Sequence, residues 1–299
     1  MAAKRKPAGT TRPPGRRTCG TMAAHMRLLE SFPQFRARQF QLEQENQRRR
    51  TRGLRAADLK TVTVRVVVNV VFRTAEQNVS DAQIRSQIAA LNRDYAAKND
   101  DRARVPAPWT GLVTDSRVRF KLVKIVRKRT TVAGFADDDT VKRPSTGGLA
   151  PFQPQKHLNI WVCALTGGLL GYAQFPGGPA ATDGVVVDWR CFGTKGTAAV
   201  PFDLGRTATH EVGHYLNLRH IWGDTEDCSG SDFVADTPNA AGPNYGTPAF
   251  PSVSCSNGPN GDMFVNYMDY VDDAAMFMFT AQQVMRMRAT LDGPRRGIY

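Results

Sequence analysis

The sequence predicts an α+β fold, on three observations. Between residues 61 and 192 lie four short segments rich in β-branched and aromatic residues, which are typical of strands. Helix-forming segments with recognisable N-terminal caps lie between and after them. Residues 223–262 consist almost entirely of turn-forming residues. The order strand, helix, three strands, helix, long loop and terminal helix is typical of an α+β domain with an irregular C-terminal part.

The basic charge of the chain is confined to its N-terminal end. The 299 residues carry a formal net charge of +13. Residues 1–60 hold 15 Lys and Arg against 4 Asp and Glu, whereas residues 61–299 hold 25 against 23. The nearly neutral remainder has no zinc-finger, RNP or basic-helix pattern, and no run approaches 18 apolar residues. We therefore expect no nucleic-acid partner and no membrane partner.

The first 54 residues form a basic leader, which we place before the main domain boundary. Residues 1–20 predict an irregular arm, and residues 22–50 favour helix with a break at Pro33. RRRTRGLR, residues 48–55, indicates an exposed linker. The first 25 residues have no apolar stretch of the kind that a signal peptide needs. The leader thus covers residues 1–54 and the body residues 55–299.

The body begins with a strand at residues 61–73, TVTVRVVVNVVFR. Ser80 and Gln83 form a capping box for the next helix. One face of this helix carries four apolar side chains, at Ile84, Ile88, Leu91 and Tyr95.

Three further strands are predicted at residues 117–126, 158–165 and 183–192. The glycine-rich residues 166–176 lie between the last two. A strand there is expected at a sheet edge, where an unpaired backbone can bind a substrate strand.

The C-terminal part combines a long loop with a capped helix. A loop as long as residues 223–262 usually needs metal or disulfide support, or has a function. Thr280 and Gln283 form a second capping box, which Phe279 and Val284 can staple. The chain has an odd number of cysteines, at Cys19, Cys163, Cys191, Cys228 and Cys255, so pairing has to be argued locally.

HEVGHYLNLRH, residues 210–220, is the pattern most specific for chemistry. On a helix, residues four apart lie above one another, so His210 and His214 can share one zinc ion. Glu211 can then reach a metal-bound water as a general base. The alternative, a helix with two surface histidines and a salt-bridging glutamate, does not explain why these three residues occur at this spacing.

His220 is the candidate for the third zinc ligand. Zinc hydrolases that take a glutamate from a second helix are disfavoured, because Glu226 in a turn-rich loop is the only glutamate after His214. To bring His220 back to the zinc, the chain must leave the helix at about residue 217 through a left-handed residue. Asn217 is the residue type that tolerates positive φ best after glycine.

The chain resembles the pappalysin family of metzincin metallopeptidases. The metzincin signature H-E-x-x-H-x-x-G-x-x-H is matched except for Asn217, which stands where the family has glycine. NYMDY, residues 266–270, is similar to the family's Met-turn, with Met268 beneath the zinc site. The segment D-x-V-x-D-T-P, Asp232 to Pro238, lies between the two motifs. The resemblance covers about residue 61 to the end.

The resemblance implies a metzincin-like architecture. It consists of a twisted mixed sheet with a backing helix and an active-site helix, and an irregular C-terminal subdomain with the Met-turn and a terminal helix. The N-terminal subdomain would cover residues 55–217 and the C-terminal subdomain residues 218–299.

The resemblance also implies a catalytic mechanism. Three neutral imidazoles hold zinc, Glu211 serves as the general base, and Tyr270, two residues after the Met-turn methionine, stabilises the tetrahedral intermediate. The edge strand would hold the peptide in extended form through the segment Gly168, Leu169, Leu170 and Gly171. In similar enzymes an acid five residues after the methionine lies at the base of the primed-side pocket. Asp273 matches it and implies cleavage on the amino side of Arg or Lys, with Asp272 as the alternative determinant.

Two structural features of the long loop are implied in the same way. Cys228 and Cys255 match a family disulfide, and Asp232 and Thr237 look like part of a calcium-binding segment, with Asp236 and Asn239 as further candidates. The alternative for this segment is an ordinary turn without an ion. Cys163 and Cys191 lie in predicted strands and are expected to be buried thiols, with a bridge between them left open.

Cys19, in the leader sequence RRTCGT, is the candidate for a cysteine switch. In metzincin zymogens a leader cysteine can occupy the fourth zinc position, and the arginines around Cys19 would lower the pKa of its thiol. If Asp273 selects basic residues, the linker QRRRTRGLRAADLK, residues 47–60, becomes a candidate for autolytic activation between Arg48 and Arg55.

The leading hypothesis is a secreted, monomeric zinc endopeptidase that is made as a zymogen and inhibited by its own leader. The alternative is a non-catalytic module with a structural zinc site and a nucleic-acid-binding N-terminal arm. Glu211 favours the enzyme, because structural zinc needs no general base.

Overall fold

A five-stranded mixed sheet forms the centre of the computed structural model, which describes residues 14–51 and 55–299. The strands are β1 (Val62–Phe72), β2 (Val118–Arg129), β3 (Leu158–Cys163), β4 (Gly171–Ala173) and β5 (Val185–Asp188), in the spatial order β2-β1-β3-β5-β4. All neighbouring strands are parallel except β4, which runs antiparallel to β5. The glycine-rich segment therefore supplies the expected edge strand, although β4 is only three residues long.

The predicted strand at residues 183–192 is too long at its C-terminal end. β5 ends at Asp188, and Trp189–Cys191 form a 3-10 turn. The cause is local, because the Asp188 side chain accepts a hydrogen bond from the backbone N–H of Arg190 and turns the chain.

The two faces of the sheet are covered by different elements. α3 (Asp81–Tyr95) begins at its Ser80 cap and packs with α4 (Arg206–Tyr215) on one face, where the even-numbered valines of β1 are buried. On the other face Trp161, Tyr172 and Val186 pack against side chains of the loop that follows β2. The sheet is therefore buried on both faces, as its continuous apolar sequences require.

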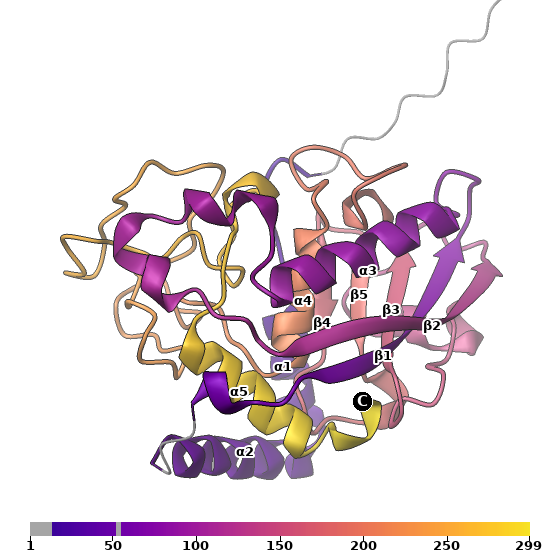
Figure 1. The fold of residues 1–299 in the computed structure, drawn as a ribbon. Coiled ribbons are helices and arrows are strands. Elements are labelled where there is room, and N and C mark those ends of the chain that lie inside the picture. The colour runs from indigo at the N-terminus through magenta and orange to yellow at the C-terminus, as the bar shows by residue number, and fades with distance from the viewer. Residues whose placement is uncertain (1–13, 52–54) are drawn as a thin grey trace, which may run out of the picture.

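The leader forms two helices that lie on the body. α1 (Thr21–Ser31) and α2 (Pro33–Thr51) are separated at Pro33 as predicted. α2 lies beside α5 (Ala281–Asp292) in Figure 1, and two ion pairs join them. Arg286 donates to both carboxylate oxygens of Glu43, and Arg49 Nη1 lies 2.8 Å from Asp292 Oδ2.

The C-terminal part is irregular, as expected. Of the described residues, 216–272 contain no α-helix and no strand of the sheet. A disulfide joins Cys228 and Cys255, which confirms the implied pairing. Cys163 and Cys191 are buried free thiols, so the possible second bridge does not form. α5 closes the chain with the predicted capping box at Thr280 and Gln283.

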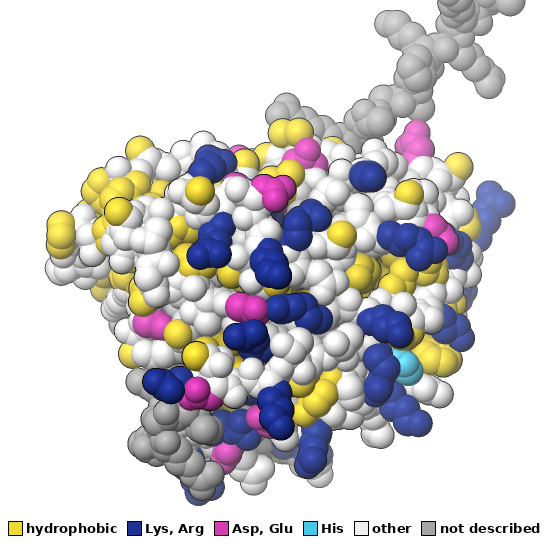
Figure 2. Space-filling model, in the orientation of Figure 1, with side chains coloured by type: hydrophobic (Ala, Val, Ile, Leu, Met, Phe, Trp, Pro, Cys, Tyr) yellow, Lys and Arg dark blue, Asp and Glu magenta, His cyan; other side chains and the backbone are white. Residues whose placement is uncertain are grey.

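The surface carries mixed charge. Lysine and arginine side chains are spread over the face shown in Figure 2, with acidic side chains among them. The edge strand β2 exposes Lys121, Lys124, Arg127 and Arg129, and charged side chains at an edge oppose pairing with other chains. Among the helices of residues 14–51 and 55–299, none is long and apolar enough to cross a membrane.

Candidate active site

Three histidine side chains converge in the interior beneath the leader. His214 Nε2 lies 3.0 Å from His210 Nε2 and 3.1 Å from His220 Nε2, and the three side chains are almost completely buried. Their Nδ1 atoms face acceptors: the carbonyl of Tyr267 for His210, the carbonyl of Leu218 for His214, and the carboxylate of Asp224 for His220. Since a carbonyl can only accept, Nδ1 carries the proton in His210 and His214, and Nε2 presents its lone pair to the common centre.

This donor set fits a zinc ion. Burial and the neighbouring imidazoles lower the pKa values of His210 and His214 well below the usual value, so both rings are neutral, as metal ligands must be. Cys19 Sγ completes the set, because one ligand atom from each of the four residues lies within 4.8 Å of the others. Three imidazoles and a thiolate suit tetrahedral zinc, and the buried Nδ1 partners fix the ring orientations.

The return of the chain to His220 depends on Asn217. α4 ends at Tyr215, and Asn217 has a φ of 76°, in the left-handed region that the sequence argument required. The backbone N–H of Leu218 then donates to the Gly213 carbonyl at 2.9 Å, which closes the helix end. The turn carries His220 back to the face of α4 that bears the other two imidazoles.

Met268 lies directly beneath this helix. It is completely buried, and a Cβ built on Gly213 would lie 2.4 Å from its Sδ. The glycine between Glu211 and His214 therefore permits the close approach of the Met-turn to α4. Met268 therefore has a structural role, because it packs against α4 at Gly213.

Glu211 is held next to the edge strand and the leader. A Cβ on Gly171 would lie 2.8 Å from Glu211 Cγ, so β4 can pass this close only at a glycine. Oε2 of Glu211 accepts hydrogen bonds from Thr21 Oγ1 at 2.9 Å and Cys19 Sγ at 3.4 Å. Burial raises the pKa of Glu211 to about 7, against the opposing effect of these hydrogen bonds. The leader therefore covers the carboxylate of Glu211, the candidate for the general base.

Tyr270 lies at the same centre. Its ring centroid is 4.8 Å from that of His220 and 5.8 Å from that of His210. Burial, followed by the neighbouring Cys19 and Glu211, raises the pKa of the Tyr270 hydroxyl, which therefore remains a proton donor.

The leader pairs with the edge strand as an additional short strand. Leu170 N–H donates to the Thr18 carbonyl at 3.0 Å, and Gly20 N–H donates to the Gly171 carbonyl at 2.9 Å. This bridge is parallel and places Cys19 opposite Gly171. Of the four expected backbone positions, Gly168 also contacts the leader, because its carbonyl accepts from the Thr18 hydroxyl. Leu169 instead packs against the apolar cluster on the other face of the sheet, which contains Trp161 and Tyr172.

Arg17 forms a buried ion pair with Asp273. Its Nη2 lies 2.6 Å from Asp273 Oδ1, and both side chains are buried. Asp273 Oδ2 accepts from the backbone N–H groups of Leu204 and Arg206, which hold the carboxylate in place. Between the two candidate acids, Asp273 is the one that binds this guanidinium, and Asp272 is only partly buried.

The prediction that the neighbouring arginines lower the pKa of the Cys19 thiol was wrong. Arg17 points to Asp273 instead of the thiol, and burial together with Glu211 raises the pKa of Cys19. The neighbouring arginines therefore do not activate it. Arg17 and Thr21 were missed as functional residues, although their positions two residues before and after the cysteine were the available signal.

Of the four loop residues predicted to bind calcium, only Asp232 and Thr237 are in contact with each other. Thr237 Oγ1 donates to Asp232 Oδ2 at 2.6 Å, and burial raises the pKa of Asp232 to about 7. Asp236 lies elsewhere, at the N-terminus of α5, where it accepts from Thr280 and Gln282. Asn239 donates to the carbonyl of Cys228.

Comparisons with known proteins give relatives along most of the chain. The M43 peptidase family model, described as pregnancy-associated plasma protein-A, matches residues 150–292. An extracellular metalloprotease of Arthroderma benhamiae is 30% identical over 249 residues, covering 81% of this chain and 82% of that protein. One of Pyricularia oryzae is 33% identical over 262 residues, covering 82% and 80%.

Two solved structures from Tannerella forsythia are similar over most of their length. A promirolysin mutant is 42% identical with a TM-score of 0.84, covering 94% of this chain and 97% of that one. Mature mirolysin in complex with a cleaved peptide is 46% identical with a TM-score of 0.79, covering 80% and 96%.

Proposed function

The chain belongs to the pappalysin family of metalloendopeptidases, and we propose that it is made as a latent zinc enzyme that cleaves peptide bonds on the amino side of arginine and lysine. The observation that carries the proposal is that the leader places Cys19 among the three histidines and Arg17 on Asp273. These residues are two positions apart, so one short segment covers both the metal centre and the specificity pocket. Family membership excludes the alternative of a non-catalytic structural-zinc module.

His210, His214 and His220 would hold the zinc, which supplies Lewis-acid polarisation and lowers the pKa of a bound water. Glu211 Oε2 accepts the proton of the attacking water and passes it to the leaving amine. The Tyr270 hydroxyl donates to the developing oxyanion, and the N–H of Leu170 and carbonyl of Gly171 bind the peptide backbone.

Specificity follows from the contact between Arg17 and Asp273. A buried carboxylate fixed by two backbone N–H groups is preorganised for one cation, and a guanidinium fits it. Arg17 also lies over the ring of Phe202, with Cζ 5.0 Å from the ring centroid. We infer that a substrate arginine or lysine replaces Arg17 there after the leader is removed.

Activation requires cleavage between leader and body, which we propose to be autolytic. Residues 48–51 belong to α2, and residues 52–54 lie outside the described residues. Arg55 has an extended backbone and a side chain that is 78% exposed. Since a peptide must be extended to pair with β4, the bond on the amino side of Arg55 is the best candidate.

Two further proposals concern conditions of function. We propose that Asp232 and Thr237 take part in a calcium site that supports the disulfide-bonded loop. We also propose secretion, because the fungal relatives are named extracellular metalloproteases and a disulfide is typical of oxidising compartments.

The test is cleavage of a denatured protein by the zinc-loaded full chain, with and without a chelator, followed by mass spectrometry of the cut sites. We expect chelator-sensitive cuts before Arg and Lys. Glu211→Ala should lower the rate about 10²- to 10⁴-fold while zinc stays bound. Glu226→Ala, on an exposed loop, is the matched control. N-terminal sequencing would also distinguish self-cleavage, since identical mature termini in wild type and Glu211→Ala would contradict autolysis.

A further inference from the structure

The acidic stretch Asp137–Asp139 lies against the part of the leader that follows Cys19. Arg17 precedes Cys19 and pairs with Asp273, whereas Gly20 and α1 follow Cys19. A Cβ built on Gly20 would lie 2.9 Å from Asp137 Oδ2. Further along α1, Arg27 Nη2 lies 3.1 Å from Asp139 Oδ2. Along the leader, the acidic stretch therefore contacts the residues after Cys19, whereas Asp273 contacts a residue before it.

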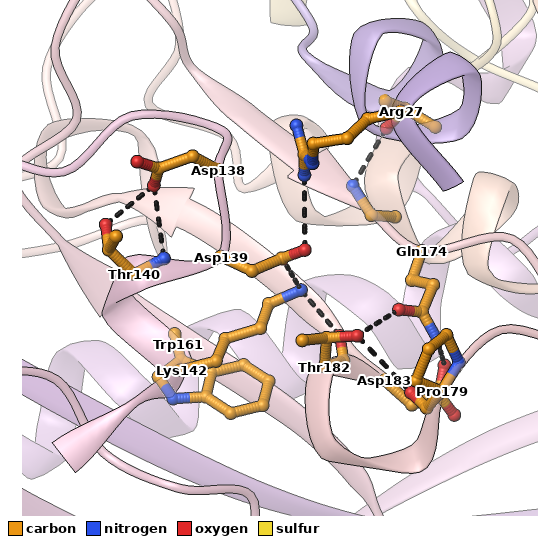
Figure 3. A network of polar contacts seen from close by, with 12 residues as sticks. Arg27, Asp138, Asp139, Thr140, Lys142, Trp161, Gln174, Pro179, Thr182 and Asp183 are labelled. Carbon is orange, nitrogen blue, oxygen red and sulfur yellow. Dashed lines mark hydrogen bonds and ion pairs between the residues drawn. The ribbon is translucent and has the colours of Figure 1, made fainter. Parts of the chain in front are cut away.

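An ion pair with the buried Lys142 holds the Asp139 carboxylate in place (Figure 3). Lys142 Nζ lies 2.7 Å from Asp139 Oδ1 and donates to the Thr182 carbonyl at 2.7 Å. The ammonium group also lies 4.8 Å from the ring centroid of Tyr172 and 5.4 Å from that of Trp161. Because these contacts hold Lys142 and Oδ1, the second oxygen of Asp139 remains directed at the leader, where Arg27 binds it.

Asp138 adds a second negative charge at the same place. Thr140 donates to it through its N–H at 3.1 Å and its hydroxyl at 2.6 Å. Partial burial raises its pKa, but these hydrogen bonds outweigh that effect and lower the pKa overall. Residues 137–142 contain three aspartates and one lysine, so the stretch carries a net charge of −2 when Arg27 leaves.

Tyr172 of the edge strand lies beside the same ion pair, with its ring centroid 4.8 Å from the Lys142 ammonium. Tyr172 of β4 is completely buried, and its hydroxyl has no hydrogen-bond partner among the described residues. The ammonium group that contacts its ring also pairs with Asp139, and burial, followed by the charge of Asp139, raises the pKa of the hydroxyl. A ligand that takes the place of Arg27 would thus meet carboxylate acceptors close to the strand that we propose to pair with substrate.

We propose that Asp138 and Asp139 form a second specificity subsite, which binds an arginine or lysine of the substrate on the amino-terminal side of the scissile bond. Arg27 occupies this subsite in the latent chain, as Arg17 occupies the Asp273 pocket. The proposal rests on the proposed endopeptidase function and extends it: the preferred substrates carry basic residues on both sides of the cut. The linker RRRTRGLR has this character, with arginines on both sides of each bond from Arg49 to Arg55.

The competing explanation is that the pair between Arg27 and Asp139 only anchors the leader. Peptide cleavage by the matured, zinc-loaded enzyme distinguishes a substrate subsite from a mere anchor of the leader, because the leader is then absent. The peptides share an arginine after the scissile bond and carry either arginine or glutamine at one of the four preceding positions. At one of these positions we expect kcat/KM to be about three- to tenfold higher for arginine, mainly through KM, and this preference should weaken at high salt.

Asp139→Asn should abolish the preference, so that the arginine and glutamine peptides are cleaved with equal kcat/KM. Since this substitution also removes the partner of Lys142, Asp138→Asn serves as the second variant and should reduce the preference without disturbing the buried pair. Asp81→Asn, which alters a partly exposed carboxylate at the start of α3, is the matched control and should retain the preference.

Equal cleavage of arginine and glutamine peptides at all four positions would overturn the subsite, and so would a preference that survives both Asp138→Asn and Asp139→Asn. Neither result affects the proposed function. Failure of the wild-type enzyme to cut any peptide with arginine after the scissile bond would instead refute the proposed function itself.

Discussion

At the scale of single residues, we propose that Arg17 and Cys19 together keep the enzyme latent. The thiol lies at the histidine centre and the guanidinium binds the pocket carboxylate. Because extended residues two apart point to the same side of a strand, one segment along β4 can present both groups. This arrangement makes the leader a competitor for the two features that we propose to bind substrate.

Arg17→Ala should weaken latency strongly. Loss of one partner of a buried ion pair costs about 3 to 5 kcal/mol, because the carboxylate of Asp273 stays buried without its cation. We expect the full chain to gain activity earlier and to mature faster, followed with a peptide that carries arginine after the scissile bond.

Arg16→Ala is the control for this variant. The Arg16 guanidinium lies 4.7 Å from the ring centroid of Tyr245, a contact worth about 1 kcal/mol or less. Equal activation kinetics of the two variants would contradict the role given to Arg17.

Asp232 allows a test of calcium binding through pH. Burial raises its pKa from 3.8 to about 7. Between these values the folded carboxyl holds a proton that the unfolded one has lost, so its contribution to stability is lost as pH rises towards 7. In calcium-free buffer, wild type should therefore lose stability relative to Asp232→Asn between pH 5 and pH 8, by on the order of 2 kcal/mol.

Calcium should reverse this difference. At pH 8, millimolar calcium should raise the denaturation midpoint of wild type and leave that of Asp232→Asn unchanged. Asp227→Asn, on the exposed part of the same loop, should behave as wild type. A calcium response of equal size in Asp232→Asn would remove Asp232 from the site.

At the scale of elements, the end of α4 and the edge strand β4 shape the site. β4 passes Glu211 at Gly171, where a side chain would collide with both Glu211 and the Val186 carbonyl. α4 ends because Asn217 turns the chain with positive φ. The first feature depends on the missing side chain of Gly171 and the second on the positive φ of Asn217, so they could be anticipated from the glycine-rich segment and from the asparagine in the signature.

Asn217→Gly should retain zinc and activity, because glycine adopts positive φ without strain. Asn217→Ala should lower the free energy of unfolding by about 1 to 2 kcal/mol, because the Cβ atom of alanine approaches the following carbonyl oxygen too closely in the left-handed conformation. The Nδ2 atom of Asn217 has no hydrogen-bond partner in the described chain, so the comparison isolates the backbone. Thermal unfolding of the zinc-bound chain is the measurement, and equal stability of the two variants would contradict this account.

At the scale of the whole molecule, the leader wraps two helices around the body and anchors them at separate points. Arg38 donates to the Gly177 carbonyl, Arg49 pairs with Asp292, and Glu43 pairs with Arg286. Arg286 in turn donates to the carbonyl of Asn217 at 2.6 Å. Many of the basic residues that raise the net charge thus serve to dock the leader, which is a simpler explanation than a nucleic-acid-binding arm.

Maturation should depend on the residue at the start of the body. Arg55→Gln should slow release of the leader about tenfold or more, because the best candidate bond loses the cation that Asp273 selects. Arg48→Gln should have little effect, since its bond lies within α2 and must be unwound to bind in extended form. Release is followed by gel electrophoresis and N-terminal sequencing. An unchanged mature terminus in Arg55→Gln would place the cut elsewhere.

The sequence by itself determined the local features of this protein. The strand composition, the N-cap at Ser80, the capping box at Thr280, the break at Pro33 and the spacing of three histidines each depend on neighbouring residues, and the structure contains them at the expected places. The capping box predicted at Ser80 forms only in part, because the Gln83 side chain donates to the Phe192 carbonyl instead of returning to Ser80. The end of β5 was misjudged because the side chain of Asp188 caps the next turn, which the apolar pattern of residues 183–192 conceals.

Only the tertiary structure decided which distant residues meet. Arg17 and Asp273 are 256 positions apart, and no periodicity in either segment relates them. The same is true of Thr21 with Glu211 and of Arg27 with Asp139, which join the leader to α4 and to the loop after β2. Contacts of this kind arise from the packing of complete elements, so the sequence predicts the centre of the site, whereas its pockets and their occupants emerge only when the leader is folded onto the body.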